Sequence, residues 1–241
     1  MDQFDNICAF VAAGGKGTRL GALGKQTQKC MLELWGKPLL YYSIIALRNA
    51  GCNRVVIAVN YLSEQIIDYF KDGRDFGIEV TYIKDEFAST YDALYKSIES
   101  LSPRIVYIHA NILFHSSLLN QMISTGNQFD KNVIAVIPNN SIDIKHAQVS
   151  FDNDRVISEI DLSECNNKHP YTFLGVAYYK KQDFIVHYNG DSSGMVEKVI
   201  QQLLQADIQS LAYIYHGDWR HIETENDYQK IRKEAKWKVE A

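Results

Sequence analysis

Short apolar segments rich in β-branched residues alternate along this chain with longer segments of helical periodicity. Such alternation predicts βα units, in which helices cover a mainly parallel sheet. In open α/β folds the loops that follow the strands gather at one edge of the sheet, and ligands bind there. In the first half we expect strands at 7–13, 54–59, 78–83 and 104–109, and helices at 38–49, 63–70 (with Ser63 as N-cap) and 90–101.

The second half of the chain is less regular. We expect a hairpin formed by 147–151 and 155–160, because the intervening Asp152, Asn153 and Asp154 favour a turn. Further strands are expected at 132–138, 171–179 and 210–215, and helices at 118–124, 181–188, 194–206 and 224–238. No linker rich in Pro, Gly or Ser interrupts the sequence. We therefore expect a single domain over 1–241, in which two halves, about 1–115 and about 116–241, share one sheet.

Charge and cysteine content exclude several classes of protein. The 241 residues include 25 basic and 29 acidic side chains, which give a formal net charge of −4 and do not favour nucleic acid as a partner. The four cysteines are far apart and include no C-x-x-C pair, so neither a structural zinc site nor a disulfide framework is expected. The first apolar run stops after seven residues, too short for a signal peptide or a membrane span. We expect a cytoplasmic protein with no membrane partner.

A glycine-rich segment, Ala13-Gly14-Gly15-Lys16-Gly17-Thr18-Arg19, directly follows the first predicted strand. Three glycines among four residues let backbone amides approach and bind an anion such as a phosphate. A P-loop is excluded because Lys16 is followed by Gly17 rather than by Ser or Thr. A dinucleotide-binding fingerprint is excluded because Leu20 replaces its last glycine, and Asn60 stands where a ribose-binding acid is expected.

The segment GGKGTRL, followed by Lys29 and then by MLELWGKPLL, resembles the opening of the sugar-1-phosphate nucleotidyltransferases, also called nucleotide-sugar pyrophosphorylases. That family's usual pattern is G-G-x-G-T-R-L, a spacer, P-K-P, a hydrophobic strand and G-K-P; the match is strong from about 7 to 70. The resemblance implies a Rossmann-like three-layer αβα sandwich with a mixed, mainly parallel sheet, of the nucleotide-diphospho-sugar transferase type. Its first half would bind the nucleotide and its second half the acceptor.

The resemblance also implies a reaction and roles for particular residues. A nucleoside triphosphate would transfer its nucleoside monophosphate to a sugar 1-phosphate or similar phosphorylated acceptor, and pyrophosphate would leave. Arg19 would stabilise the β,γ-phosphates, and Lys29 the α-phosphate and the incoming phosphate. The usual P-K-P appears as Gln28-Lys29-Cys30, so we expect Lys29 to be held less rigidly. The expected nucleotide-binding residues are Ala13, Gly14, Gly15, Lys16, Gly17 and Thr18, with Ser89 and Thr90 in the loop assigned to the base.

For Ser89 and Thr90 the sequence leaves two alternatives open. Either side chain could hydrogen-bond a base edge, but a helix N-cap explains either one equally well. The identity of the base is not predicted.

Two positions depart from the family where its magnesium ligands stand. The first aspartate of the family pattern falls on Asn111, at the end of the 104–109 strand, and the second falls on His221 within Trp219-Arg220-His221-Ile222-Glu223-Thr224. An asparagine carbonyl brings no negative charge, and imidazole is a poor ligand for magnesium but a better one for zinc or manganese. Binding of Mg²⁺ (or Mn²⁺) is therefore expected to be weakened. The candidate substitute ligands are Glu223, which along a strand shares a face with His221, and Asp85 and Glu86, which are expected in a loop at the same edge of the sheet; most surface acids are merely solvated.

The acceptor half also departs from the family, because the Glu-Lys pair that many relatives carry after the hairpin is incomplete. Glu159 or Asp161 could bind sugar hydroxyls, whereas the lysine is missing. Three functions stay open: a nucleotidyltransferase that makes a nucleotide-activated sugar, a cytidylyltransferase for a sugar-alcohol or choline-like phosphate, and a catalytically impaired paralogue that only binds a nucleotide or nucleotide sugar. The expected partners are a nucleoside triphosphate and a phosphorylated acceptor, with a homo-oligomer possible.

Overall fold

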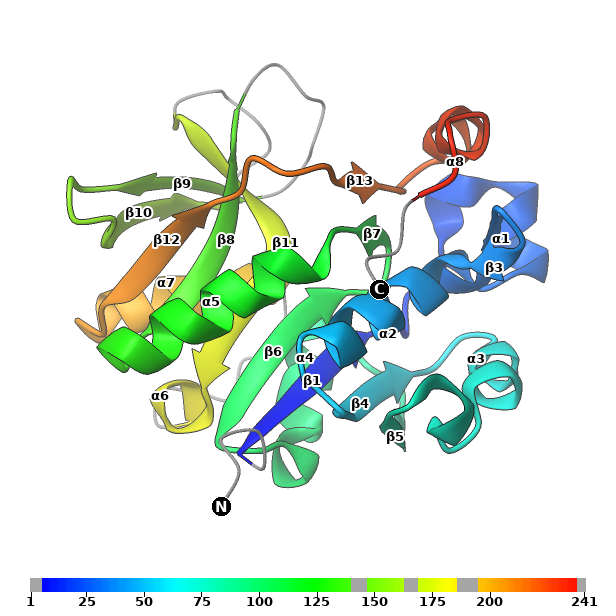
Figure 1. Cartoon of the computed structure of the whole chain (residues 1–241), viewed down its shortest axis with the longest axis horizontal. Helices are drawn as coiled ribbons and strands as arrows, with labels where there is room; N and C mark the ends of the chain where they lie inside the picture. The colour runs from blue at the N-terminus through cyan, green and yellow to red at the C-terminus, as the bar shows by residue number, and fades with distance from the viewer. Residues whose placement is uncertain (1–5, 140–146, 163–168, 186–194, 238–241) are drawn as a thin grey trace.

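A computed structural model describes residues 6–139, 147–162, 169–185 and 195–237 of the chain (Figure 1). Within these residues, nine strands form one mixed sheet with β10-β9-β11-β6-β1-β4-β5 as its main path, while β8 pairs with β11 and β12 pairs with β8. The strands are β1 (Ile7–Ala12), β4 (Arg54–Val59), β5 (Glu79–Lys84), β6 (Arg104–His109), β8 (Asn132–Pro138), β9 (Gln148–Phe151), β10 (Ile157–Asp161), β11 (Tyr171–Lys180) and β12 (Ser210–Ile214).

The remaining elements are helices and short strands. Two short pairs lie outside the sheet, β2 (Glu33–Leu34) with β3 (Lys37–Pro38), and β7 (Ile112–Leu113) with β13 (Arg220–His221). The α-helices are α1 (Ala22–Gln26), α2 (Leu39–Asn49), α3 (Ser63–Phe70), α4 (Thr90–Lys96), α5 (Ser116–Phe129), α6 (Lys181–Ile185), α7 (Glu197–Gln205) and α8 (Glu225–Arg232). The 3₁₀ turns are η1 (Thr18–Leu20), η2 (Lys29–Met31), η3 (Arg74–Phe76) and η4 (Ile98–Ser100).

The core lies on both faces of the sheet, as the side chains of β1 show. Ile7, Ala9 and Val11 join a buried cluster with apolar residues of α2, α3 and α5. Cys8 and Phe10 point to the other face and join a second cluster with residues of α4 and α7. Because alternate residues of a strand face opposite sides, a strand that is apolar at every position requires cover on both. The three-layer αβα fold predicted from the sequence is therefore confirmed, and Figure 1 shows α2 and α5 lying across one face.

Some predicted boundaries were wrong in detail. Ser63 is the first residue of α3, and Leu62, in the left-handed region at φ 51°, is its N-cap. The helix predicted over 90–101 ends at Lys96 and continues as the 3₁₀ turn η4, where the Ser97 hydroxyl donates to the Ala93 carbonyl. Serine and threonine side chains compete for backbone hydrogen bonds in this way and interrupt regular helices.

An irregularity in β11 shapes the edge of the sheet. The register between β11 and β8 shifts between Phe173 and Ala177, and Gly175 lies there at φ +88°. A Cβ at Gly175 would lie 2.7 Å from Nδ1 of His109, a distance that real side chains do not reach. Glycine at this bulge therefore provides the space for the ring of His109 at the carboxyl end of β6.

The C-terminal part of the chain returns to the first half of the fold. β13 pairs antiparallel with β7, so that His221 lies opposite Ile112. Beyond it, Tyr228 and Ile231 of α8 pack with Leu20 and Leu34 in a third small core. This return brings residues 221–223 to the carboxyl ends of β1 and β6. Within the described ranges, no helix combines the length and the apolar character needed to cross a bilayer.

Candidate active site

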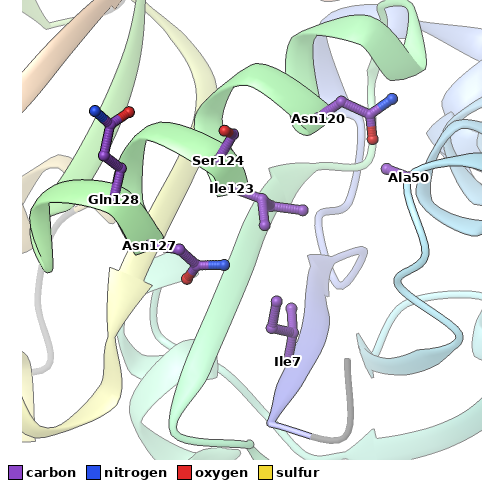
Figure 2. Close-up of a pocket in the computed structure, with 7 residues that line it drawn as sticks. All are labelled: Ile7, Ala50, Asn120, Ile123, Ser124, Asn127 and Gln128. Carbon is purple, nitrogen blue, oxygen red and sulfur yellow. The ribbon is translucent and has the colours of Figure 1, made fainter. Parts of the chain in front are cut away.

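A cavity of about 410 Å³ lies at the carboxyl ends of β1, β4 and β6. Its walls come from the glycine loop, the segment around Lys29, the loop before α4 and the residues after β6, together with Met195 and Glu223. A second cavity of about 450 Å³ lies at the opposite, amino end of β1, between Ile7 and α5 (Figure 2). Among the described residues its lining contains no charged side chain, whereas Lys16, Lys29 and Glu223 line the first cavity, at the edge of the sheet where open α/β folds bind ligands.

The glycine loop lies at the cavity wall in a conformation that requires glycine. Gly14, Gly15 and Lys16 line the cavity. A Cβ at Gly14 would lie 3.3 Å from the ring of Phe87, and Gly17 adopts φ +60°, in the left-handed region. The chain then turns into η1, which carries Thr18 and Arg19. Backbone amides in such a loop are open to a ligand because no side chains stand in front of them.

Hydrogen bonds from Gln28 fasten the segment that carries Lys29. Gln28 is only 2% exposed. Its Nε2 donates to the Ala13 carbonyl at 2.6 Å, and its Oε1 accepts from the Cys30 amide at 2.6 Å. Its own amide donates to Oε1 of Gln65 at 2.9 Å. We expected Lys29 to be loosely held without the family's prolines, but the structure instead ties this segment to the glycine loop.

Arg19 and Lys29 converge on the carboxylate of Glu223. The guanidinium of Arg19 pairs with one oxygen, and Nζ of Lys29 lies 3.7 Å from the other. The side chain of Lys29 is 20% exposed, whereas that of Arg19 is 61% exposed. Burial and, to a smaller extent, the charge of Arg19 lower the pKa of Lys29 from 10.5 to about 8. Lys29 and Glu223 line the cavity, and Arg19, which is not among the lining residues, pairs with the same carboxylate.

Asn111 and His221 lie in direct contact. The side-chain amide of Asn111 donates to Nε2 of His221 at 2.7 Å and to the Ile222 carbonyl at 3.0 Å. The Ile222 amide in turn donates to the Asn111 carbonyl at 3.0 Å. Nε2 of His221 also lies 3.4 Å from Oε1 of Glu223. The two positions that depart from the family pattern are thus brought together and bonded to one another.

These residues do not fit magnesium. The nucleotidyltransferase family generally uses Mg²⁺, which takes oxygen ligands and is bound by carboxylates and phosphates. Here an uncharged amide and an imidazole occupy the two positions, and their polar atoms bond to each other. Among the described residues, no three His, Cys, Asp or Glu side chains are grouped to hold a metal ion.

The other predicted residues fall into two groups. Ser89 and Thr90 line the cavity, but Ser89 is the N-cap of α4 and accepts from the Asp92 amide, while Thr90 Oγ1 accepts from the Val196 amide. Glu159 and Asp161 are not among the cavity-lining residues.

Glu159 and Asp161 lie together on β10 and face one buried histidine. Nε2 of His169 is 3.7 Å from Oε1 of Glu159 and 3.9 Å from Oδ2 of Asp161. Nδ1 of His169 hydrogen-bonds the hydroxyl of Ser150 at 2.8 Å. β11 runs antiparallel to β6, and Val176 pairs with Ile108 near the carboxyl end of β6. The residues of β11 before Val176 therefore extend beyond that end, and the β9–β10 hairpin pairs with them there. This places the hairpin toward the edge of the sheet that holds the cavity.

Sequence reasoning missed the parts of the site that arise from long-range contacts. From sequence, Gln28 is notable only as the residue that replaces the first proline of the family's P-K-P pattern, and nothing distinguishes Phe87 or Met195. The family alignment did point to Glu223 as a neighbour of His221, but no sequence pattern indicates that its carboxylate meets Arg19 and Lys29.

The family model for nucleotidyl transferases matches residues 8–238. The chain belongs to the nucleotidyl transferase family. It is 31% identical over 153 residues to the mannose-1-phosphate guanylyltransferase catalytic subunit beta of Drosophila pseudoobscura pseudoobscura, a match that covers 62% of this chain and 41% of that protein. It is 23% identical over 224 residues to the 2-C-methyl-D-erythritol 4-phosphate cytidylyltransferase of Clostridium perfringens, covering 90% of this chain and 92% of that one.

Solved structures of the family share the fold. The inositol-1-phosphate CTP transferase from T. maritima superposes with a TM-score of 0.77 at 18% identity, covering 95% of this chain and 96% of that chain. At this level of identity the likeness concerns the fold.

Proposed function

We propose that this chain transfers a nucleoside monophosphate from a nucleoside triphosphate to a sugar 1-phosphate or a similar phosphorylated acceptor, with release of pyrophosphate. The observation that carries the proposal is that Lys29, which lines the cavity beside the glycine loop, and Arg19, which follows that loop in the chain, converge on one cavity-lining carboxylate. Two cations and a set of open backbone amides suit a triphosphate. The family to which the chain belongs supports the same reaction.

The reaction needs mainly positioning and charge. A phosphate oxygen of the acceptor attacks the α-phosphorus in line; a new P–O bond forms as the bond from the α-phosphorus to the bridging oxygen breaks, and pyrophosphate leaves with that electron pair. Because two anions must meet, catalysis depends on positive charge held in place beforehand. We assign Lys29 to the α-phosphate and the incoming phosphate, Arg19 to the departing phosphates, and the backbone at 14–17 to the triphosphate. No step is assigned to a metal.

For the acceptor we propose Glu159 and Asp161, whose carboxylates can accept hydrogen bonds from hydroxyl groups. The acceptor can be a sugar 1-phosphate or a sugar-alcohol phosphate used with a cytidine nucleotide. The second alternative is supported by the relative from Clostridium perfringens, which aligns with nearly the whole chain. We place the reaction in the cytoplasm.

Pyrophosphate release tests the proposal. The protein is incubated with each of four nucleoside triphosphates and a panel of sugar 1-phosphates, sugar-alcohol phosphates and phosphocholine, with Mg²⁺, with Mn²⁺, or with EDTA. We expect release with at least one combination. The hydrogen bond between Asn111 and His221 favours a second candidate, a protein that binds the nucleotide without transferring it. Nucleotide binding by calorimetry without pyrophosphate release in any mixture would establish that candidate instead.

A further inference from the structure

The carboxylate of Glu223 lies among two basic side chains and one imidazole, which come from three separate segments. Arg19 comes from η1, Lys29 from η2 and His221 from β13. Arg19 and Lys29 form ion pairs with the two oxygens of Glu223, and Nε2 of His221 lies 3.4 Å from Oε1. Glu223 and Lys29 both line the cavity. An anionic group of the chain itself therefore occupies the place where the basic groups of the cavity would meet a phosphate.

The backbone at Glu223 is fixed, whereas its side chain has room to move. The Glu223 amide donates to Oδ2 of Asp227 at 3.1 Å, and the same oxygen accepts from the Thr224 amide and hydroxyl in the capping box of α8. The Glu223 side chain remains 28% exposed. Rotation of this side chain would release Arg19 and Lys29 without a change in the backbone.

The local charges leave no place for a magnesium–triphosphate complex at the usual positions. Asn111 and His221 present no carboxylate, and the Asn111 amide nitrogen hydrogen-bonds Nε2 of His221 at 2.7 Å. The nearest carboxylate, Glu223, is paired with Arg19 and Lys29. A divalent cation would add positive charge beside these two groups without a dedicated counter-charge, whereas free triphosphate supplies the negative charge that both groups need.

We propose that this site binds the free nucleoside triphosphate anion rather than its magnesium complex, and that the triphosphate displaces the Glu223 carboxylate from Arg19 and Lys29 as it enters. The inference rests on the proposed function, because it concerns the form of the nucleotide at the same site. It assigns to Glu223 the role of an internal competitor that holds the two cations in place until the substrate replaces it.

The first test compares nucleotide affinity with and without the cation. Titration calorimetry of the full chain with each nucleoside triphosphate is run in EDTA and in excess MgCl₂. We expect the Kd in EDTA to be equal to or lower than the Kd in MgCl₂. A Kd at least about tenfold lower in MgCl₂, a difference of about 1.4 kcal/mol, would overturn this inference and leave the proposed function intact. Absence of binding for all four nucleotides in both buffers would instead overturn the proposed function and this inference with it.

The second test replaces the competing carboxylate. Glu223→Gln keeps the shape of the side chain but removes its charge, so we expect the Kd in EDTA to fall about fivefold to tenfold through the loss of competing ion pairs. Glu225→Gln is the matched control, because it removes one negative charge from an exposed position two residues away, and its Kd should stay near that of the wild type. An unchanged or higher Kd for Glu223→Gln in EDTA would contradict the proposal. Weakened binding confined to MgCl₂ would also contradict it and would identify Glu223 as a metal ligand.

The third test restores the family's carboxylates. In Asn111→Asp combined with His221→Asp, we expect MgCl₂ to lower the Kd relative to EDTA, unlike in the wild type. Circular dichroism and the thermal midpoint show whether this double variant folds. If MgCl₂ changes the Kd equally in the wild type and in a folded double variant, Asn111 and His221 are not the reason why the wild type binds the free triphosphate. If the double variant does not fold, the Kd values of Glu223→Gln and Glu225→Gln in EDTA decide whether the triphosphate competes with the Glu223 carboxylate.

Discussion

The sequence position of Lys29, its burial and its proposed role all point to the binding of a phosphate. Its position in the sequence matches the family's lysine, and η2 places its ammonium group at the cavity wall. Burial of the side chain makes the charged form less stable in the free protein, which lowers its pKa to about 8. An incoming phosphate would supply the missing counter-charge. The residue is therefore suited to bind an anion more strongly than an exposed lysine would.

Removal of the Lys29 ammonium should slow the reaction strongly. We expect Lys29→Ala to lower kcat/KM for pyrophosphate release by about 10² or more, the loss typical of one preorganised charge donor. Lys25→Ala is the control, because Lys25 is exposed and lies outside the cavity. A variant that retains nearly full activity would show that Lys29 is not part of the machinery.

The same residue predicts a pH dependence. Because the pKa of Lys29 is about 8, the ammonium is charged below that pH and loses its proton above it. Free protein therefore loses a phosphate-binding cation as the pH rises, and kcat/KM should fall above about pH 8. Lys29→Arg keeps its charge at higher pH, so its profile should stay flat up to about pH 10. A decline that is identical in the two proteins would assign the titration to another group.

At the scale of elements, Gln28 shows how a local departure from the family is compensated. A proline would restrict the backbone at this position, whereas Gln28 fixes it with hydrogen bonds to Ala13, Cys30 and Gln65. These bonds join the end of β1, the 3₁₀ turn η2 and helix α3. The glycine loop and Lys29 are therefore positioned relative to each other by one buried side chain.

Truncation of Gln28 should affect both stability and catalysis. We expect Gln28→Ala to lower the free energy of unfolding by about 1–3 kcal/mol, because the buried Ala13 carbonyl and Cys30 amide lose their partner. Loss of positioning should lower kcat more than it raises KM for the nucleotide. Urea unfolding and steady-state kinetics measure the two effects. Gln26→Ala, at an exposed position in α1, should change neither, and an equal effect in both variants would argue against a specific role of Gln28.

Sequence patterns predicted elements that are long and periodic better than short ones. The predicted bounds of β4, α3, β6 and β8 agree with the structure, because buried β-branched runs and apolar helix faces have clear periods. The short pairs β2–β3 and β7–β13 were not predicted, since two residues carry no period. The glycine loop and Lys29 could be found from sequence because they belong to one local motif whose residues are close together in the chain. The contact of Glu223 with Arg19 could not, because 204 residues separate the two in the chain.

At the scale of the whole molecule, the two halves lie side by side in one sheet and are joined where β11 meets β6. β11 from the second half lies between β6 and β8 and pairs with both. The C-terminal segment also returns to the first half, where the Trp35 indole donates to the Glu234 carbonyl at 3.1 Å. Neither half can therefore lose its structure without exposing strand edges and apolar surface of the other.

From this arrangement we propose that the chain unfolds as one cooperative unit. Far-UV circular dichroism reports the whole sheet, whereas fluorescence from Trp35, Trp219 and Trp237 reports the region around α8 and the site. Their thermal transitions should coincide, and the ratio of van't Hoff to calorimetric enthalpy should be about 1. A ligand that bridges both halves should shift both transitions equally. Separate transitions, with nucleotide stabilising only one of them, would show instead that the nucleotide-binding half is an independent domain, and that the acceptor half docks onto it after folding.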